Sequence, residues 1–283
     1  MSQAATDFGA WRLALPLAGF FALFFLAPLG LLAAVSLFAD SELSRLGLDQ
    51  YAKFLGDPFN WRVLGDTILL GFQVTAATLL FGYPLAWLFH RVSRRLQTGL
   101  ILIVILPLLT SVVVRTFAWI VILGRQGIVN SALLALGLID SPLTLLYSHL
   151  GVVLALAQVQ MPLMVLPLIT SLGKLDPNLA DASAALGAGT WRTFLRVILP
   201  LSLPGIVAGC MLTFGAAVTA FITQSLIGGA RPVYMPLYIY QQALTLQNWP
   251  FAAAVSIIFM LAVLLFVMLF ERLGQLSRGY AHA

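Results

Sequence analysis

Long uncharged runs of apolar residues constrain this chain more than any other feature of its sequence. The first run, residues 13–38, contains 26 residues and no charged side chain. A helix needs about 20 apolar residues to cross the hydrocarbon core of a bilayer, whereas the apolar core of a secretory signal peptide has about 7–15. We therefore expect a retained membrane-spanning helix here.

Five further runs repeat this pattern. Hydrophobic residues make up 61% of the 283 residues and charged residues only 9%, whereas soluble domains carry roughly 25% charged residues. A water-soluble fold of this length cannot bury so much apolar surface. The sequence predicts an all-α membrane protein with six spans, at residues 13–38, 67–89, 100–123, 145–172, 198–227 and 251–270.

The basic residues predict which side of the membrane each loop faces. Six spans place both termini on one side, and basic residues are enriched on the cytoplasmic side. With the termini inside, the inner segments hold nine basic residues and the outer loops hold five, so both termini are predicted to be cytoplasmic. The inner nine are Arg12, Arg91, Arg94, Arg95, Lys174, Arg192, Arg196, Arg272 and Arg278, and the outer five are Arg45, Lys53, Arg62, Arg125 and Arg231.

This topology divides the chain into three parts. Residues 1–63 carry the first span and a periplasmic loop, residues 64–270 form a five-helix core, and residues 271–283 form a cytoplasmic tail. The core includes a cytoplasmic loop at residues 173–197 and an outer loop at residues 228–249, whose middle is expected to form a short helix.

The cytoplasmic loop contains a short helix with clear ends. Asp176 suits the N-cap and Pro177 the first helical position. Gly187 can take the left-handed conformation that closes a helix. The sequence therefore predicts a helix from Pro177 to Leu186, followed by a second helix for which Thr190 is the expected N-cap.

One apolar stripe runs along the short helix, formed by Leu179, Ala182 and Leu186 at helical spacing. A helix of this kind either lies among lipid headgroups or docks into a groove on a soluble partner. A lipid-binding helix carries a basic polar face and large apolar anchors, whereas this one carries Asp181 and several alanines. These small residues favour docking into a protein groove.

This loop resembles the signature loop of binding-protein-dependent ABC importer permeases. That pattern reads Glu-Ala-Ala, three residues, Gly, nine residues, Ile, one residue and Leu-Pro. Gly187, Leu199 and Pro200 match in register, and Asp181, Ser183 and Val197 are conservative replacements for Glu, Ala and Ile. In that family the helix couples the permease to a cytoplasmic ATPase, which implies coupling roles for Leu179, Asp181, Ala182, Ser183, Leu186 and Gly187.

Further segments are similar to the first permease subunit of spermidine/putrescine-type importers, at residues 114–119, 127–130, 136–140, 145–147 and 248–250. The resemblance implies the fold of a type I ABC importer permease in a bacterial inner membrane. It also implies a second homologous permease, two ATPase subunits that bind ATP and Mg, and a periplasmic solute-binding protein. The implied substrate is a polyamine, or else an amino-acid-like or phosphonate solute.

Polar and aromatic side chains within the spans are candidates for the substrate path. They are Tyr83, Arg115, Trp119, Gln158, Gln160, Phe221, Thr223 and Gln224. Isolated Gln and Thr residues in spans equally often form interhelical hydrogen bonds. Arg115 is costly in hydrocarbon and must face protein or water. It either contacts substrate or serves the structure by reaching the interface or pairing with a carboxylate such as Asp66, and we favour the structural role.

Two further features bear on the substrate and the assembly. A polycationic substrate is expected to meet carboxylates or aromatic faces, yet no Asp or Glu lies in the middle of any predicted span. Gly205 and Gly209 have the spacing that lets another helix approach closely. This spacing arises either by chance or at the interface with the second permease.

No catalytic or metal site is expected, so the chain is not predicted to be an enzyme. Gly173-Lys174 lacks the upstream Gly and the following Ser or Thr of a phosphate-binding loop. ATP must therefore bind to a partner chain. The histidines lie far apart, at His90, His149 and His282. An ion-coupled secondary carrier is the alternative, but it calls for mid-membrane acids or inverted repeats.

Overall fold

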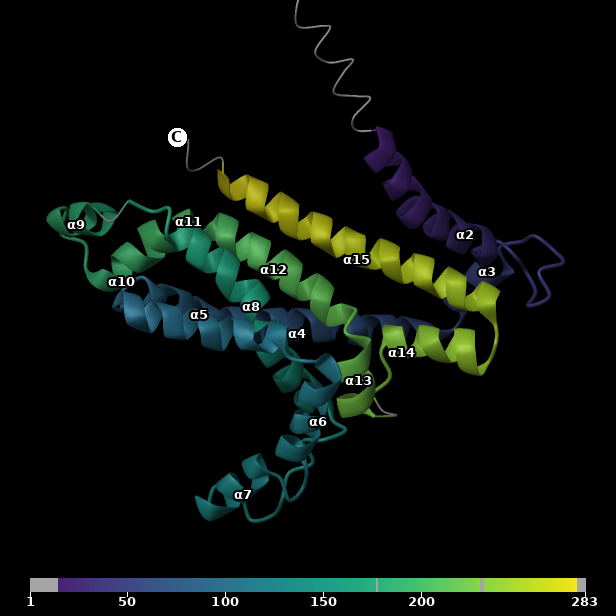
Figure 1. Cartoon of the computed structure of the whole chain (residues 1–283), viewed down its shortest axis with the longest axis horizontal. Helices are drawn as coiled ribbons and strands as arrows, with labels where there is room; N and C mark the ends of the chain where they lie inside the picture. Colours follow the sequence, from purple (N-terminus) through teal and green to yellow (C-terminus); the bar gives the residue numbers. More distant parts are fainter. Residues whose placement is uncertain (1–14, 177, 230–231, 279–283) are drawn as a thin grey trace, which may run out of the picture. The chain divides into compact units, whose positions relative to one another are not determined.

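The computed structural model describes residues 15–176, 178–229 and 232–278, and helices joined by loops make up this part of the chain (Figure 1). It contains two compact units. The first comprises the described residues up to Trp61 together with Ile239–Leu261. The second comprises Arg62–Tyr238 together with the described residues from Ala262 onward. The predicted span start at Leu13 and helix start at Pro177 lie outside the described residues.

Several helical segments in the described residues are long and apolar enough to span a bilayer. Five qualify directly: Leu15–Ser36, Pro58–Phe89, Val112–Ala135, His149–Leu172 and Trp249–Arg272. Thr190–Leu201 and Leu203–Val218 give a sixth span when this bent pair is counted as one. The predicted number of spans is therefore confirmed, although some of the predicted boundaries are wrong.

In the first unit, the π-helical turn η1 (Ala22–Leu26) continues into α2 (Ala27–Ser36), and α3 (Asp49–Gly56) follows after a loop. The predicted short helix in the 228–249 loop is confirmed as α14 (Met235–Tyr240), which leads into the π-helical turn η3 (Gln241–Thr245). The last helix, α15 (Trp249–Arg278), begins directly after Asn248.

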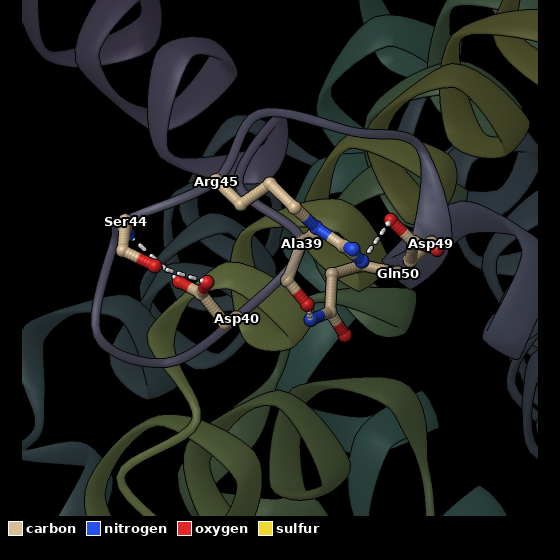
Figure 2. A network of polar contacts seen from close by, with 6 residues as sticks. All are labelled: Ala39, Asp40, Ser44, Arg45, Asp49 and Gln50. Atoms are coloured by element: carbon tan, nitrogen blue, oxygen red, sulfur yellow. Dashed lines mark hydrogen bonds and ion pairs between the residues drawn. The ribbon is translucent and has the colours of Figure 1, made fainter.

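Side-chain hydrogen bonds close the loop between α2 and α3 (Figure 2). The Asp40 carboxylate accepts hydrogen bonds from the Ser44 amide at 2.8 Å and from the Ser44 hydroxyl at 2.6 Å. These bonds lower the pKa of Asp40. Gln50 Nε2 donates to the Ala39 carbonyl at 2.7 Å. The loop is thus held by local bonds at both of its ends.

The second predicted span starts too late in the sequence. Helix α4 (Pro58–Phe89) begins at Pro58, because the Asp57 carboxylate accepts a hydrogen bond from the Phe59 amide at 2.9 Å and Pro suits the first helical position. The predicted start at Thr67 left Asp66 outside the span. The structure places this acid inside the helix.

The core of the second unit is built by α4, α5 (Arg94–Leu109), α8 (His149–Leu172) and α12 (Leu203–Val218) (Figure 1). Helix α12 packs along α8, and α5 packs against α8. A Cβ atom at Gly205 would lie 2.4 Å from Ser171 Cβ, and one at Gly209 would lie 2.7 Å from Met164 Sδ. The two glycines therefore let α8 of the same chain approach closely, and a second subunit is not needed to explain their spacing.

The third predicted span, 100–123, is broken in the structure. Helix α5 ends at Leu109, Thr110 with extended backbone and Ser111 follow, and α6 begins at Val112 and ends at Leu123. The break leaves carbonyl groups at the end of α5 without intrahelical partners. Arg115 Nη1 donates a hydrogen bond to the Pro107 carbonyl and another to Thr110 Oγ1 at 3.4 Å. The Thr110 hydroxyl also donates to the Pro107 carbonyl, at 3.1 Å, so Arg115 and Thr110 together satisfy the end of the broken helix.

The fifth predicted span, 198–227, is also broken, and it belongs to a run of five consecutive elements that begins before residue 198. They are α10 (Thr190–Thr193), the π-helical turn η2 (Phe194–Ile198), α11 (Leu199–Leu201) and, after a bend of 62°, α12, with α13 (Phe221–Gly228) following. At the second break, Gln224 Nε2 donates to the Ala217 carbonyl at 2.8 Å and to the Val218 carbonyl at 3.2 Å.

The segment after α6 carries its own helix, α7 (Ile128–Ala135). Asn130 is fully buried and holds the loop together. Its Nδ2 donates to the Gly124 carbonyl at 3.1 Å and to the Leu143 carbonyl at 3.0 Å, and its Oδ1 accepts from the Leu143 amide at 2.8 Å.

We predict that Gly205→Ala lowers the stability of the protein by about 1–3 kcal/mol, because an added methyl group overpacks the α8–α12 contact. The measurement is thermal unfolding of the purified protein in detergent. Gly215→Ala in the same helix is the matched control, since a Cβ there meets no atom within 4 Å. Equal unfolding temperatures for the two variants would contradict the close contact.

We also predict that Arg115→Met lowers stability by about 1–3 kcal/mol, because the Pro107 carbonyl loses its charged donor and keeps only the Thr110 hydroxyl, at 3.1 Å. Arg115→Lys is expected to recover part of the loss, since an ammonium group can still donate. Unfolding in detergent measures both effects. Unchanged stability of Arg115→Met, combined with a loss of transport, would instead indicate a contact with substrate.

Candidate functional site

The helix of the 173–197 loop is α9 (Asn178–Ala185), and both of its predicted caps are confirmed. Asp176 Oδ1 accepts a hydrogen bond from the Asn178 amide at 2.9 Å. At the other end, Gly187 has φ +79°. The Gly187 amide donates to the Ala184 carbonyl at 2.9 Å and the Ala188 amide to the Ser183 carbonyl at 3.1 Å, which is the Schellman pattern.

The residues of the predicted apolar stripe on α9 differ in their exposure. Leu179 is half-buried and lines a cavity of about 370 Å³ together with Trp87 of α4 and Ile198 of η2. Ala182 is exposed, and Leu186 is 90% exposed. Leu179 therefore anchors α9 to its own chain, whereas Ala182 and Leu186 present an apolar surface to the outside.

Polar residues connect α9 to α10. The hydroxyl groups of Ser183 and Thr193 lie 2.9 Å apart, and Thr193 is buried. The prediction that Thr190 is the N-cap of α10 is wrong. Gly189 occupies that position with extended backbone, and no side chain forms a cap bond there. The turn at Gly187 places Thr190 one position inside the helix, so its hydroxyl group does not reach the first amides.

Four of the eight predicted path residues are engaged within the protein framework. Arg115 and Gln224 supply donors at the two helix breaks, as described above. Tyr83 is buried, and its hydroxyl group lies 2.9 Å from Ser202 Oγ. Thr223 is buried as well, and its hydroxyl group lies 3.4 Å from that of Thr116 on α6.

The remaining predicted residues gather where α6, α8 and α13 pack together. Trp119 Nε1 donates to Gln158 Oε1 at 3.2 Å, and both side chains are partly exposed. Phe221 is partly exposed at the start of α13, while Gln160 is buried in α8. The structure thus brings Trp119 and Gln158 together and separates them from Tyr83, which lies near the α11–α12 bend.

A second polar cluster was not predicted. His149 Nδ1 lies 2.9 Å from the Tyr234 hydroxyl group, and His149 Nε2 is hydrogen-bonded to Gln73 Oε1. The Met235 amide donates to Thr67 Oγ1 at 2.9 Å. These residues come from α4, α8 and the segment before α14, and nothing in their sequence spacing indicates the contact.

Comparison with known proteins supports the assignment that the loop suggests. Residues 79–276 match the family described as the binding-protein-dependent transport system inner membrane component. The spermidine/putrescine transport system permease protein PotB of Escherichia coli strain K12 is 34% identical over 229 residues, which cover 81% of this chain and 83% of that protein. PotB of Salmonella typhimurium strain LT2 is 35% identical over 81% of this chain and 79% of its own length.

The fold is shared with a permease chain of known structure. A bacterial ABC transporter involved in the import of the acidic polysaccharide alginate superposes with a TM-score of 0.76 at 20% identity, covering 96% of both chains. The type I importer permease fold predicted from the sequence is therefore confirmed. The chain belongs to the family of binding-protein-dependent transport system inner membrane components, and it is a permease subunit of an ABC importer.

Proposed function

We propose that this permease carries polyamines such as spermidine and putrescine. The observation that carries the proposal is the similarity to PotB proteins, which extends over 81% of this chain. Members of this family serve binding-protein-dependent transport, which makes the ion-coupled carrier the weaker alternative. Amino-acid-like and phosphonate solutes are the alternative substrates, and the uptake experiment below distinguishes them from polyamines.

The position of Asp66 supports a cationic substrate. Polyamines carry ammonium groups, and a carboxylate within a span offers them a favourable contact. Asp66 lies in α4 and is partly exposed, and it forms no salt bridge within the described residues, where Arg45 and Asp49 form the one ion pair. Burial raises the pKa of Tyr234, and the negative charge of Asp66 raises it further. Asp66 therefore lies close to the polar cluster of Tyr234 and His149.

We predict that Asp66→Asn lowers the maximal rate of polyamine uptake by roughly three- to tenfold, because a charge-assisted contact contributes about 1.5 kcal/mol or less in a partly exposed site. Uptake of labelled putrescine, spermidine, a phosphonate and an amino acid into proteoliposomes measures the effect. Asp140→Asn, at an exposed loop carboxylate, is the matched control. Preference of the wild-type transporter for the phosphonate or the amino acid would contradict the polyamine assignment.

The half-exposed members of the predicted path set are proposed to line the substrate path. These are Trp119, Gln158 and Phe221, at the junction of α6, α8 and α13. Aromatic faces suit cations because their π-systems carry negative charge. The buried Gln224 Oε1 has no hydrogen-bond donor within the described residues. This free acceptor supports a polar contact with a ligand near these three residues. The Arg115, Tyr83 and Thr223 side chains are assigned to the framework that holds these helices.

We propose further that the exposed face of α9 docks into a groove on a cytoplasmic ATPase. The assembly would comprise this chain, a second homologous permease, two ATPase subunits that hold ATP and Mg, and a periplasmic solute-binding protein. Both termini would then face the cytoplasm. Exposed apolar side chains beside a polar loop favour a protein partner, and Leu186 and Trp191 are 90% and 71% exposed.

The mechanism that follows is alternating access. Closure of the ATPase dimer on ATP displaces α9, and the displacement opens the path outward. Hydrolysis resets the assembly. ATP drives the cycle only if the two states of the path prefer different states of the ATPase, since coupling is a difference in binding free energy.

We predict that Ala182→Glu uncouples ATP hydrolysis from uptake without preventing folding. A glutamate in a docked apolar groove is an unpaired, desolvated charge, so uptake should fall roughly tenfold or more, the factor that corresponds to about 1.4 kcal/mol. Uptake and ATP hydrolysis of the reconstituted transporter are measured together. Ala184→Glu is the matched control, because Ala184 is exposed and lies roughly 200° around the same helix. Normal coupled uptake by the Ala182 variant would refute the docking role.

A further inference from the structure

The segment after α9 is joined to α12 through a bend at Ser202, whose amide donates to the Ile198 carbonyl at 2.9 Å and whose carbonyl accepts from the Ile206 amide at 3.1 Å. The helices on either side, Thr190–Leu201 and Leu203–Val218, meet at 62°. Pro200 and Pro204 flank the bend and have no amide hydrogen to donate. The π-helical turn η2 precedes it. Ser202 lies at its centre and is fully buried. Because the two prolines remove backbone donors next to this junction, side-chain contacts contribute to fixing its angle.

Tyr83 of α4 provides a side-chain restraint at this bend. Ser202 Oγ donates its one hydrogen to the Leu199 carbonyl at 2.9 Å, so the hydrogen bond of 2.9 Å between Tyr83 and Ser202 has the tyrosine as donor. Both side chains are buried, with exposed fractions of 8% for Tyr83 and 0% for Ser202. The bond therefore forms away from competing water and has a defined direction.

The same end of α4 also contacts the segment before the bend. The Phe194 ring lies edge-on to Tyr83 at 5.7 Å and packs against Trp87 at 5.3 Å. Trp191 stacks on Phe194 at 5.5 Å. Tyr83 of α4 thus contacts both η2, through Phe194, and the centre of the bend, through Ser202.

We propose that Tyr83 is a positioning residue that fixes the angle between the coupling loop and α12 through its hydrogen bond to Ser202. With the bond in place, a displacement of α9 is transmitted to α12. Without it, the bend absorbs part of the displacement and less substrate moves for each ATP hydrolysed. This inference rests on the proposed docking of α9 to an ATPase, and it assigns Tyr83 to transmission of movement rather than to the substrate path.

The test compares Tyr83→Phe with the wild-type complex in proteoliposomes. Phenylalanine keeps the ring contacts with Phe194 and removes the hydroxyl group. We expect the ratio of solute transported to ATP hydrolysed to fall about three- to tenfold, the range that one net hydrogen bond can change, with KM for the solute unchanged. Tyr51→Phe is the matched control, because the Tyr51 hydroxyl group bonds Ser36 Oγ at 2.7 Å in the other unit. An unchanged ratio, or a change in KM alone, would overturn the proposal.

A double-mutant cycle with Ser202→Ala tests the pair directly. If the two hydroxyl groups act together, the double variant loses no more coupling than the more affected single variant. Additive losses would show that Tyr83 acts elsewhere and would overturn the assignment.

A structural readout separates this inference from the proposed function. Spin labels are placed at Ala184 and Leu212, both exposed, in the assembled transporter with the buried Cys210 replaced by alanine. We expect Tyr83→Phe to broaden the distance distribution between the labels, whatever the transported solute is. A distribution as narrow as that of the parent would refute the restraint, whereas failure of the polyamine or docking assignment would leave this broadening intact.

Discussion

The structure depends on one constraint: backbone N–H and C=O groups surrounded by apolar side chains and lipid must be hydrogen-bonded within the protein. Continuous helices satisfy this condition by themselves. Broken helices do not, and this chain breaks its helices near Thr110, Ser202 and Thr219. At each break a polar side chain restores bonds that the backbone lost. Arg115 and Thr110 donate to the Pro107 carbonyl at the first break, Ser202 donates to the Leu199 carbonyl at the middle one, and Gln224 donates at the last.

This constraint explains why several polar residues in the spans turned out to have structural partners. From sequence, a glutamine or arginine in an apolar run indicates only that something polar is nearby. It does not distinguish a substrate from a free carbonyl group at the end of a broken helix. The three-dimensional structure makes the distinction for Arg115 and Gln224, because their donors point to carbonyl groups on the preceding helix. Trp119 and Gln158, which bond to each other and stay partly exposed, keep surface available for a ligand.

Features that depend on local chemistry were predictable, and features that depend on distant contacts were not. The caps of α9 follow from Asp176 and Gly187, whose preferences act within a few residues. The number of spans follows from apolar length. The partner of Gly205 and Gly209 did not follow, because spacing shows that a helix can approach but not which one. The contact between Gln73, His149 and Tyr234 joins residues far apart in sequence. The break after α5 was missed because its stabilising donor, Arg115, belongs to the next helix.

The packing of α8 against α12 affects how a movement of α9 is transmitted in the proposed mechanism. Helix α9 is connected to the end of α8 by the turn at 173–176 and to α12 by the segment from Thr190 to Leu201. Because Gly205 and Gly209 bring α8 and α12 into close contact, the two helices form one packed pair that cannot slide freely. A force on α9 enters this pair at both ends of the loop. On the α12 side it crosses the bend at Ser202, so in the proposed mechanism the stiffness of that bend decides how much of the movement reaches α12.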